Sequence, residues 1–294
     1  MKDKRLYQPQ YIREILEQYG FTFSKALGQN FLIDGNVVRN IAEGAEVSKE
    51  DIILEVGPGI GTLTEELAMR AKKVFCVEKD SRLIPILKET LKDFDNIRFI
   101  NEDILKFDWD SFMEEHTEGK RIKIVANLPY YITTPIIESI LKRAYRVESI
   151  TVMVQKEVAE RMVATEKDSN YGSLSLFIRY FSEAKIIAKV PNQVFMPKPD
   201  VDSAVIRLTT RNLNYPGDEE FLFGLIRSGF VKRRKTILNS LTKGFVQVDK
   251  KNLREVLEEL SISEKSRAEN LSMDDFMNIA DGGQRHRRHA DPDR

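Results

Sequence analysis

The sequence predicts an α/β protein whose mostly parallel sheet, with an antiparallel hairpin at its edge, is followed by a small all-α domain. Between residues 52 and 164, short apolar runs alternate with stretches of helical spacing, which is typical of parallel strands joined by crossover helices. Two β-rich runs follow, and we expect them to form the antiparallel hairpin. Beyond residue 218, apolar residues recur only at helical spacing.

A helical extension is expected before the sheet. Residues 9–19 place apolar side chains at helical spacing before Gly20, and Asp34 can cap a second helix that ends near Ala45. The expected strands are residues 52–56, 74–77, 97–100, 122–126 and 149–154 in the parallel part, and 184–190 and 203–209 in the hairpin. The expected helices in and after the sheet include residues 62–70, 82–92, 156–164, 221–241 and 253–260.

A cluster of turn-forming residues at 212–218 marks the expected domain boundary. We expect residues 1–211 to contain the sheet and residues 212–281 to form the helical domain. Residues 282–294 begin with two glycines and continue with arginines and histidines, so we expect a disordered tail.

The composition excludes several classes of protein. Of 294 residues, 41% are hydrophobic and 31% charged, which is typical of globular proteins. No apolar stretch approaches the ~18 residues of a membrane helix, and we find no signal-peptide core, so we expect a cytoplasmic protein without a membrane partner. The single cysteine, Cys76, lies in an apolar run and is expected to be a buried structural thiol. The three histidines lack neighbours at ligand spacing, so we expect no metal site.

Three glycines follow the first predicted strand of the sheet, at Gly57, Gly59 and Gly61. Glycines between a strand and a helix let a ligand approach the backbone closely, although a tight turn without a ligand has the same pattern. Glu78 lies 21 residues after Gly57, at the offset where an acid meets ribose hydroxyls. The spacing G-x-G-x-G differs from the pyrophosphate motif, which suggests a nucleoside cofactor without a phosphate, such as S-adenosylmethionine. Asp103, after the third strand, is equally consistent with an adenine contact or a helix cap.

The most specific motif is Asn127-Leu128-Pro129-Tyr130, directly after the fourth strand. Adenine N6 is a poor nucleophile because its lone pair is delocalised into the ring, so its methylation needs acceptors that hold both N–H bonds. The side-chain oxygen of Asn127 and the carbonyl of Leu128 can be these acceptors. Tyr130 can stack on an extruded base. The motif therefore predicts a site for methyl transfer to adenine.

Four motifs together resemble the ribosomal RNA adenine N6,N6-dimethyltransferase family and, within it, the small-subunit (16S) branch. They are residues 28–32 (GQNFL), 55–61 (EVGPGIG), 127–130 (NLPY) and 195–203 (FMPKPDVDS). The resemblance implies a class I S-adenosylmethionine-dependent methyltransferase fold of the Rossmann-like type. It also implies dimethylation of two adjacent adenosines in the 3′-terminal hairpin of small-subunit rRNA, a role in 30S biogenesis, and the immature 30S subunit as partner.

The resemblance also implies roles for single residues. At the cofactor, Asn30 and Leu32 would contact the methionine end, and Gly57 would contact the cofactor through its backbone. Glu78 would bind the ribose and Asp103 the adenine, with Asn127 beside them. At the target base these are Asn127 and Leu128 for N6, with Tyr130 and Phe195 on opposite sides of the ring. We expect a monomer.

A basic, acid-free stretch extends from Arg227 to Gly244, although the chain as a whole has no net charge. A locally basic face can bind a polyanion because association depends on the local field. On a helix, Ile226, Phe230, Ile237 and Leu241 would form one buried stripe. We expect Lys232, Arg233, Arg234 and Lys235 to project from that helix and contact rRNA phosphates, although a solvated charged surface has the same pattern.

Three alternatives remain open at this stage. The macrolide-resistance methyltransferases of large-subunit rRNA share most of these motifs. An NAD-dependent dehydrogenase would fit the glycines and Glu78, but not the glycine spacing or the Asn127 motif. An RNA-binding ribosome-assembly factor whose catalysis is secondary would fit the basic stretch.

Overall fold

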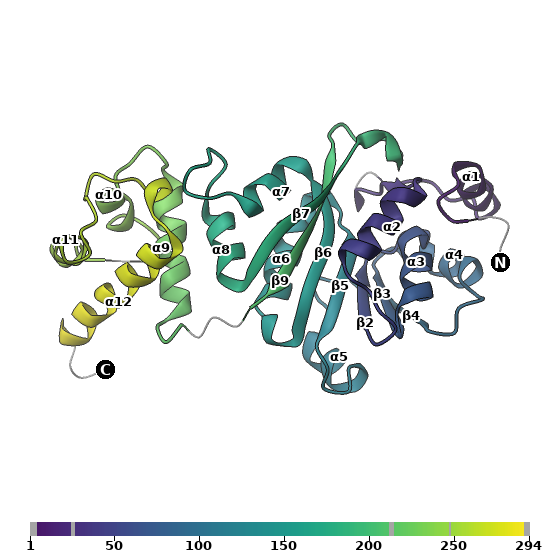
Figure 1. Cartoon of the computed structure of the whole chain (residues 1–294), viewed down its shortest axis with the longest axis horizontal. Helices are drawn as coiled ribbons and strands as arrows, with labels where there is room; N and C mark the ends of the chain where they lie inside the picture. The colour runs from purple at the N-terminus through teal and green to yellow at the C-terminus, as the bar shows by residue number, and fades with distance from the viewer. Residues whose placement is uncertain (1–4, 25–26, 212–214, 247, 291–294) are drawn as a thin grey trace. The chain divides into compact units, whose positions relative to one another are not determined.

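The computed structural model describes the backbone of residues 5–24, 27–211, 215–246 and 248–290. Its main feature is a seven-stranded sheet in the order β4-β3-β2-β5-β6-β9-β7 (Figure 1). The strands are β2 (Ile52–Val56), β3 (Lys73–Glu78), β4 (Ile97–Asn101), β5 (Ile122–Asn127), β6 (Val147–Gln155), β7 (Ser182–Val190) and β9 (Ser203–Thr210). The predicted α/β class, with a mostly parallel sheet, is confirmed.

The pairing of the strands follows the predicted pattern. Strands β4, β3, β2, β5 and β6 are parallel to their neighbours, while β9 is antiparallel to both β6 and β7. The edge hairpin is therefore present, and β9 is the strand that runs against the rest. In register, Val56 lies beside Val77 and Glu78 beside Asn101, so the carboxyl ends of β2, β3 and β4 meet at one edge of the sheet.

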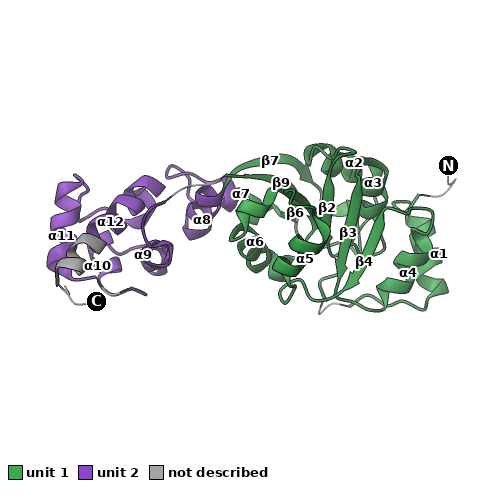
Figure 2. Cartoon of the chain, turned by 90° about the horizontal axis from the view of Figure 1, so that it is seen from below, with its two compact units in different colours: residues 1–159, 182–212 green, residues 160–181, 213–294 purple. Residues whose placement is uncertain are grey.

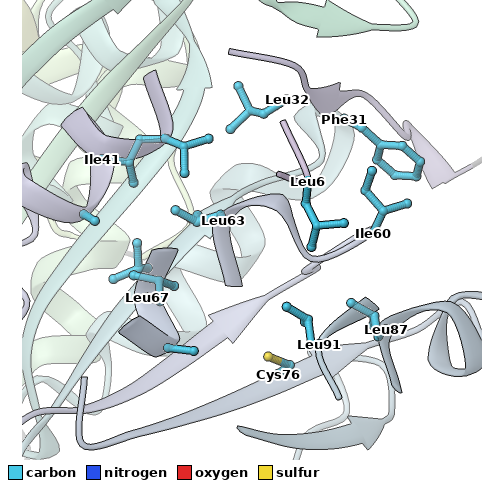
Figure 3. Packing of buried hydrophobic residues seen from close by; sticks show 14 of the residues in the cluster. Leu6, Phe31, Leu32, Ile41, Ile60, Leu63, Leu67, Cys76, Leu87 and Leu91 are labelled. Atoms are coloured by element: carbon cyan, nitrogen blue, oxygen red, sulfur yellow. The ribbon is translucent and has the colours of Figure 1, made fainter. Parts of the chain in front are cut away.

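Helices cover both faces of this sheet, which explains why its central strands are buried and mostly apolar on both sides. All five residues of β2 are buried. In β3, Val74 and Cys76 belong to the cluster packed against the helices of one face, whereas Phe75 contacts Phe112 on the other. Figure 3 shows part of this cluster, in which Cys76 lies among leucines and isoleucines. The prediction of a buried thiol is confirmed.

The helices of the sheet-bearing region begin at recognisable signals. They are α1 (Pro9–Gln18), α2 (Gly35–Gly44), α3 (Thr62–Arg70), α4 (Leu83–Thr90), α5 (Trp109–His116), α6 (Thr133–Leu141) and α7 (Lys156–Val163). Pro9 occupies the first turn of α1, and the Asp34 side chain accepts from Asn36 and Val37 N–H at the start of α2, as predicted. Asp108 caps α5 in the same way.

A second, two-stranded sheet was not predicted. Strand β1 (Phe31–Leu32) pairs antiparallel with β8 (Phe195–Met196), so that Phe31 lies beside Met196 and Leu32 beside Phe195. Two-residue strands leave no periodic signal in a sequence, because periodicity needs several repeats. The pairing brings two of the four family motifs together across more than 160 residues.

Contacts divide the chain into two compact units, residues 1–159 with 182–212 and residues 160–181 with 213–294 (Figure 2). The second unit includes α8 (Ser173–Phe181), which the sequence had placed in the first domain. The reason is local packing, since Tyr171, Leu176 and Tyr180 belong to the core of the second unit and the Tyr171 hydroxyl donates to the Leu271 carbonyl.

The second unit is helical, but it differs from the prediction in two places. Its other helices are α9 (Glu219–Val231), α10 (Ile237–Leu241), α11 (Lys250–Glu259) and α12 (Met273–Ala290). A single helix over 221–241 is wrong, because residues 232–236 separate α9 from α10. The disorder expected from residue 282 also differs from the structure, since α12 extends to Ala290 and residues 291–294 lie outside the described part. Gly282 fits there because a Cβ would approach Val256 to 2.6 Å.

Candidate functional site

A cavity that is partly open to solvent lies at the carboxyl ends of the parallel strands. Ligands of open α/β sheets bind at this edge. Its lining comes mainly from five segments, residues 27–32, 55–60, 77–79, 102–104 and 127–132. Three of the four sequence motifs thus meet in one cavity.

The glycine loop forms one wall of the cavity. Gly57, Gly59 and Gly61 all have positive φ, at 67°, 61° and 91°, in the region where side chains are strained. A Cβ at Gly59 would lie 3.0 Å from the Phe31 ring, whereas a Cβ at Gly57 would meet nothing within 4 Å. Gly59 is therefore required for packing, and the backbone at Gly57 faces open space, as a ligand contact needs.

Glu78 ends β3 and lines the cavity with only 7% of its surface exposed. One carboxylate oxygen accepts from Asp80 N–H at 2.8 Å, and the other accepts from Gly59 N–H at 3.3 Å. Burial raises the pKa of Glu78 to about 7 in spite of these bonds. The loop and the carboxylate are thus fixed to each other.

Asp103 lines the same cavity from the end of β4. It lies 3.0 Å from the Lys79 ammonium and accepts from Leu105 N–H at 3.1 Å. The bond from Lys79 lowers the pKa of Asp103, so the carboxylate stays ionised. The helix-cap alternative is wrong in detail, since Asp103 stabilises a turn and Asp108 caps the next helix.

Asn127 is the last residue of β5, and its side chain is oriented by a distant segment. Its Nδ2 donates to the Asn30 carbonyl at 2.9 Å. This bond identifies the nitrogen, and within the described residues the structure records no donor to Oδ1. Leu128 follows with its N–H bonded to the Met153 carbonyl at 3.2 Å. Asn127 thus keeps one acceptor available in the cavity.

Tyr130 lies half-buried at the cavity, and its hydroxyl shares a 2.7 Å hydrogen bond with Ser203 Oγ. Burial raises the pKa of Tyr130, so the phenol stays neutral. Ser203 begins β9, so the hairpin at the sheet edge holds this ring. Asn30 and Leu32 also line the cavity, as expected.

Phe195 is the one cavity residue that the structure does not place as predicted. It is 3% exposed, belongs to the core cluster and is not among the lining residues. Its place in β8 explains this, because pairing with Leu32 turns the segment toward the core. In this structure Phe195 pairs with β1 and packs in the core cluster.

Glu55 belongs to the second family motif, and the pKa of its carboxyl is raised further than that of Glu78. It lines the cavity from β2, is fully buried, and lies 3.7 Å from Cys76 Sγ. Burial raises the pKa of Glu55 to about 8, so it is largely protonated near neutral pH. A glutamate within an otherwise apolar strand was the available signal.

The four basic residues predicted to contact rRNA lie between α9 and α10. Lys232, Arg233, Arg234 and Lys235 are all exposed. Arg233 is already engaged, since its guanidinium donates to the Ser169 carbonyl at 2.9 Å and lies 3.4 Å from Glu269. Lys232 and Lys235 instead line a groove with Lys243 and the 67%-exposed Phe245. No acidic residue of the described chain lines this groove.

Two features are absent from the described part of the chain. No helix there is long and apolar enough to cross a bilayer. No group of three or more His, Cys, Asp or Glu side chains is arranged to bind a metal ion.

Comparison with known sequences finds one family along almost the whole chain. The family model described as ribosomal RNA adenine dimethylase matches residues 20–283. A protein of Alkaliphilus oremlandii named ribosomal RNA small subunit methyltransferase A is 49% identical, over 92% of this chain and 96% of its own. One of Bacillus pumilus with the same name is 46% identical, over 95% and 97%.

Solved structures agree with these sequence matches. A dimethyladenosine transferase from Plasmodium falciparum superposes with a TM-score of 0.74 and 29% identity, covering 85% of this chain and 95% of its own. The 23S rRNA methyltransferase ErmE superposes with a TM-score of 0.64 and 26% identity, covering 86% and 99%.

Proposed function

The chain belongs to the ribosomal RNA adenine dimethylase family, and we propose that it uses S-adenosylmethionine to convert two adjacent adenosines of 16S rRNA to N6,N6-dimethyladenosine. The observation that supports this most directly is that Glu78 and Asn127 line the same cavity, where the Asn30 carbonyl orients the Asn127 amide. The target adenosines are those of the 3′-terminal hairpin of the small-subunit rRNA, and the modification belongs to 30S biogenesis.

The residues of the cavity fit this cofactor. The open backbone at Gly57 and the carboxylate of Glu78 suit a nucleoside whose ribose hydroxyls donate to an anion. Asp103 accepts from the adenine amine, and Asn30 and Leu32 lie at the methionine end. When bound, S-adenosylmethionine supplies an electrophilic methyl group on a positively charged sulfur.

At the target base, the protein provides position and hydrogen bonding. Asn127 Oδ1 and the Leu128 carbonyl accept the two N6–H bonds, which favours a pyramidal nitrogen with its lone pair available. Tyr130 stacks on the extruded base. In each transfer an N–C bond forms at N6 as the bond between the methyl carbon and the donor sulfur breaks, the sulfur leaves as a neutral thioether, and one N6 proton passes to water. In the second transfer the target amine carries only one N–H bond, so one of the two acceptors has no donor. No general base is needed because the amine becomes acidic only as the new bond forms.

The second unit binds the rRNA backbone. Lys232, Arg234 and Lys235 are exposed, and two of them line the groove that has no acidic residue. Such a groove attracts phosphates and gives affinity without sequence selection. In this proposal the enzyme is a cytoplasmic monomer that acts on immature 30S subunits.

The small-subunit branch is favoured over the macrolide-resistance branch because relatives named small subunit methyltransferase A are 43–49% identical, against 26% for ErmE. The dehydrogenase alternative has no support from these relatives. An assembly factor with secondary catalysis keeps support from the basic groove alone.

The test is to incubate the protein with methyl-labelled S-adenosylmethionine and 30S subunits from cells that lack this modification, and then to map the label. We expect two adjacent dimethylated adenosines in the 3′-terminal hairpin. Label in 23S rRNA would support the macrolide-resistance type, and binding without label would support an assembly factor. Either result would reject the proposed reaction.

The basic groove has its own test. Replacing Lys232, Arg234 and Lys235 together by Ala should weaken 30S binding and flatten its dependence on log salt by up to ~0.7 to 0.9 per lost contact. Cofactor affinity should not change. Arg233 is left intact because its contacts to Ser169 and Glu269 are structural. A wild-type salt slope in the triple variant would show that these cations are only a solvated surface.

A further inference from the structure

The orientation of Asn127 depends on where the Asn30 carbonyl lies. The bond from Asn127 Nδ2 to this carbonyl is 2.9 Å long. If the amide were flipped, Oδ1 would face the carbonyl oxygen and the two acceptors would repel each other. Whatever fixes the backbone at Asn30 therefore decides which Asn127 atom is available to the target amine.

Gln29, the residue before Asn30, is held by hydrogen bonds at both ends of its side-chain amide. Its Nε2 donates to Asp80 Oδ2 at 2.9 Å, and its Oε1 accepts from Ser24 N–H at 2.8 Å. On the other side of Asn30, β1 is fixed by its pairing with β8. The Asn30 carbonyl thus lies between two anchored points.

Asp80 is in turn held by Arg82 and by its own backbone. Its carboxylate accepts from Arg82 Nε at 2.9 Å and Nη2 at 2.6 Å, while Arg82 packs over the Phe21 ring at 4.9 Å. The Asp80 N–H donates to Glu78 at 2.8 Å. The Arg82 guanidinium holds the pKa of Asp80 below its usual range, so the carboxylate accepts at all working pH values.

We propose that Asp80 and Gln29 are positioning residues that hold Asn127 in its methyl-transfer orientation through the backbone of Asn30. Asp80 is 7% exposed and is not among the residues that line the cavity, whereas Gln29 lines it, so Asp80 acts through Gln29 and not on a ligand. The chain of contacts Glu78–Asp80–Gln29–Asn30–Asn127 joins the cofactor side of the cavity to the target side. The inference rests on the proposed methyl transfer.

The experiment compares Asp80→Asn with the wild type, measuring kcat on 30S subunits at saturating S-adenosylmethionine and cofactor affinity by calorimetry. An amide at residue 80 is neutral and accepts on one side only, so it cannot keep the hydrogen bonds from both Gln29 and Arg82, and the chain of contacts that holds Gln29 is broken at one of them. We expect kcat to fall about tenfold or more, because displacement of a reacting group by 1 Å has effects of this size. Cofactor affinity should stay within about threefold, since the backbone bond from residue 80 to Glu78 remains.

The double variant Asp80→Asn with Gln29→Glu provides a rescue. It moves the carboxylate from residue 80 to residue 29, so that the hydrogen bond between them is reversed while the amide oxygen at residue 80 can still accept from Arg82. We expect kcat to recover most of the loss. Asp108→Asn, at the cap of α5, is the matched control with unchanged kcat, because Asp108 does not line the cavity.

Three results would overturn the proposal: a wild-type kcat in Asp80→Asn, a loss explained entirely by weaker cofactor binding, or no recovery in the double variant. If Asp80→Asn does not fold, Gln29→Met removes both amide contacts at similar volume and must show the same loss of kcat. The wild-type protein is measured in the same assay, and a lack of activity there would contradict the proposed methyl transfer itself.

Discussion

The carboxyl ends of β3 and β5 present two polar side chains to one cavity, but they hold them in different ways. Glu78 is fixed by N–H groups of Gly59 and Asp80, which lie within twenty residues of it. Asn127 is fixed by the carbonyl of Asn30, ninety-seven residues away. The Glu78 side is therefore built locally by one βαβ unit, formed by β2, α3 and β3, whereas the Asn127 side depends on an N-terminal segment that lies far from it in the sequence.

This difference predicts that variants on the two sides lose different properties, cofactor affinity on one side and the rate of transfer on the other. Changes near Glu78 alter a charged, buried carboxyl and should affect cofactor affinity and its pH dependence. Changes near Asn127 alter the direction of a neutral amide and should affect the rate of transfer.

The largest effect is expected from Asn127→Ala, which removes the side-chain acceptor for N6. We expect kcat to fall by about 100-fold or more, as for loss of a preorganised polar contact in a transition state. Cofactor affinity by calorimetry should survive, because the residue is assigned to the amine. Turnover above about a tenth of the wild-type rate would contradict the separation of the two sides.

Glu78→Ala should show the opposite pattern, with weaker cofactor binding. Loss of two hydrogen bonds to a charged acceptor should reduce affinity by about 2 to 4 kcal/mol. At saturating cofactor, much of the wild-type kcat should return. Unchanged affinity would place the ribose elsewhere in the cavity.

The same carboxyl predicts a pH dependence of cofactor binding. Burial raises the pKa of Glu78 to about 7 in the free protein, and ribose hydroxyls donate to the ionised form. Affinity should therefore fall as pH decreases below 7, by up to about tenfold per unit. In Glu78→Gln the affinity should be lower and should not change with pH through this group. A flat wild-type profile would contradict the assignment.

The smallest expected effect concerns stability and Glu55. Its pKa is raised from 4.5 to about 8 by burial, so between these values the folded protein binds more protons than the unfolded one. The free energy of unfolding should then decrease as pH rises through this window. Glu55→Gln removes this loss and should be more stable than the wild type at pH 8 by about 1 kcal/mol or more. Urea unfolding at pH 5 and pH 8 measures it, and equal pH dependence in both proteins would contradict it.

Much of the fold could be predicted because its signals are repetitive or local. The apolar runs of β2 to β6 match the predicted strands closely, and Asp34 caps α2 as its type and position indicate. The break between α9 and α10 was missed because residues 232–235 are ordinary helix formers and their exposure was already explained by a helix. Gly282 and Gly283 predict the start of a disordered tail, but both lie within α12, where a Cβ at Gly282 would approach Val256 to 2.6 Å.

The candidate site was predictable where one residue sits at the end of one strand. Gly57, Glu78, Asp103 and Asn127 all line the cavity, since parallel strands end at a common edge. Phe195 does not line the cavity as predicted, because its environment is set by pairing with β1. A two-residue strand leaves no periodic pattern from which this pairing could be predicted. The roles of all these residues stay predictions until the variants are measured.

By itself, the sequence determined the parallel sheet, the order of its strand-end motifs and the helical character of the second unit, because these follow from local periodicity and residue chemistry. Only the tertiary structure decided that the Asn30 carbonyl orients Asn127, that Asp80 holds Gln29, and that residues 160–181 pack with the second unit. These are contacts between segments far apart in the chain. Their geometry depends on how the whole core packs, and no short pattern of residues encodes it.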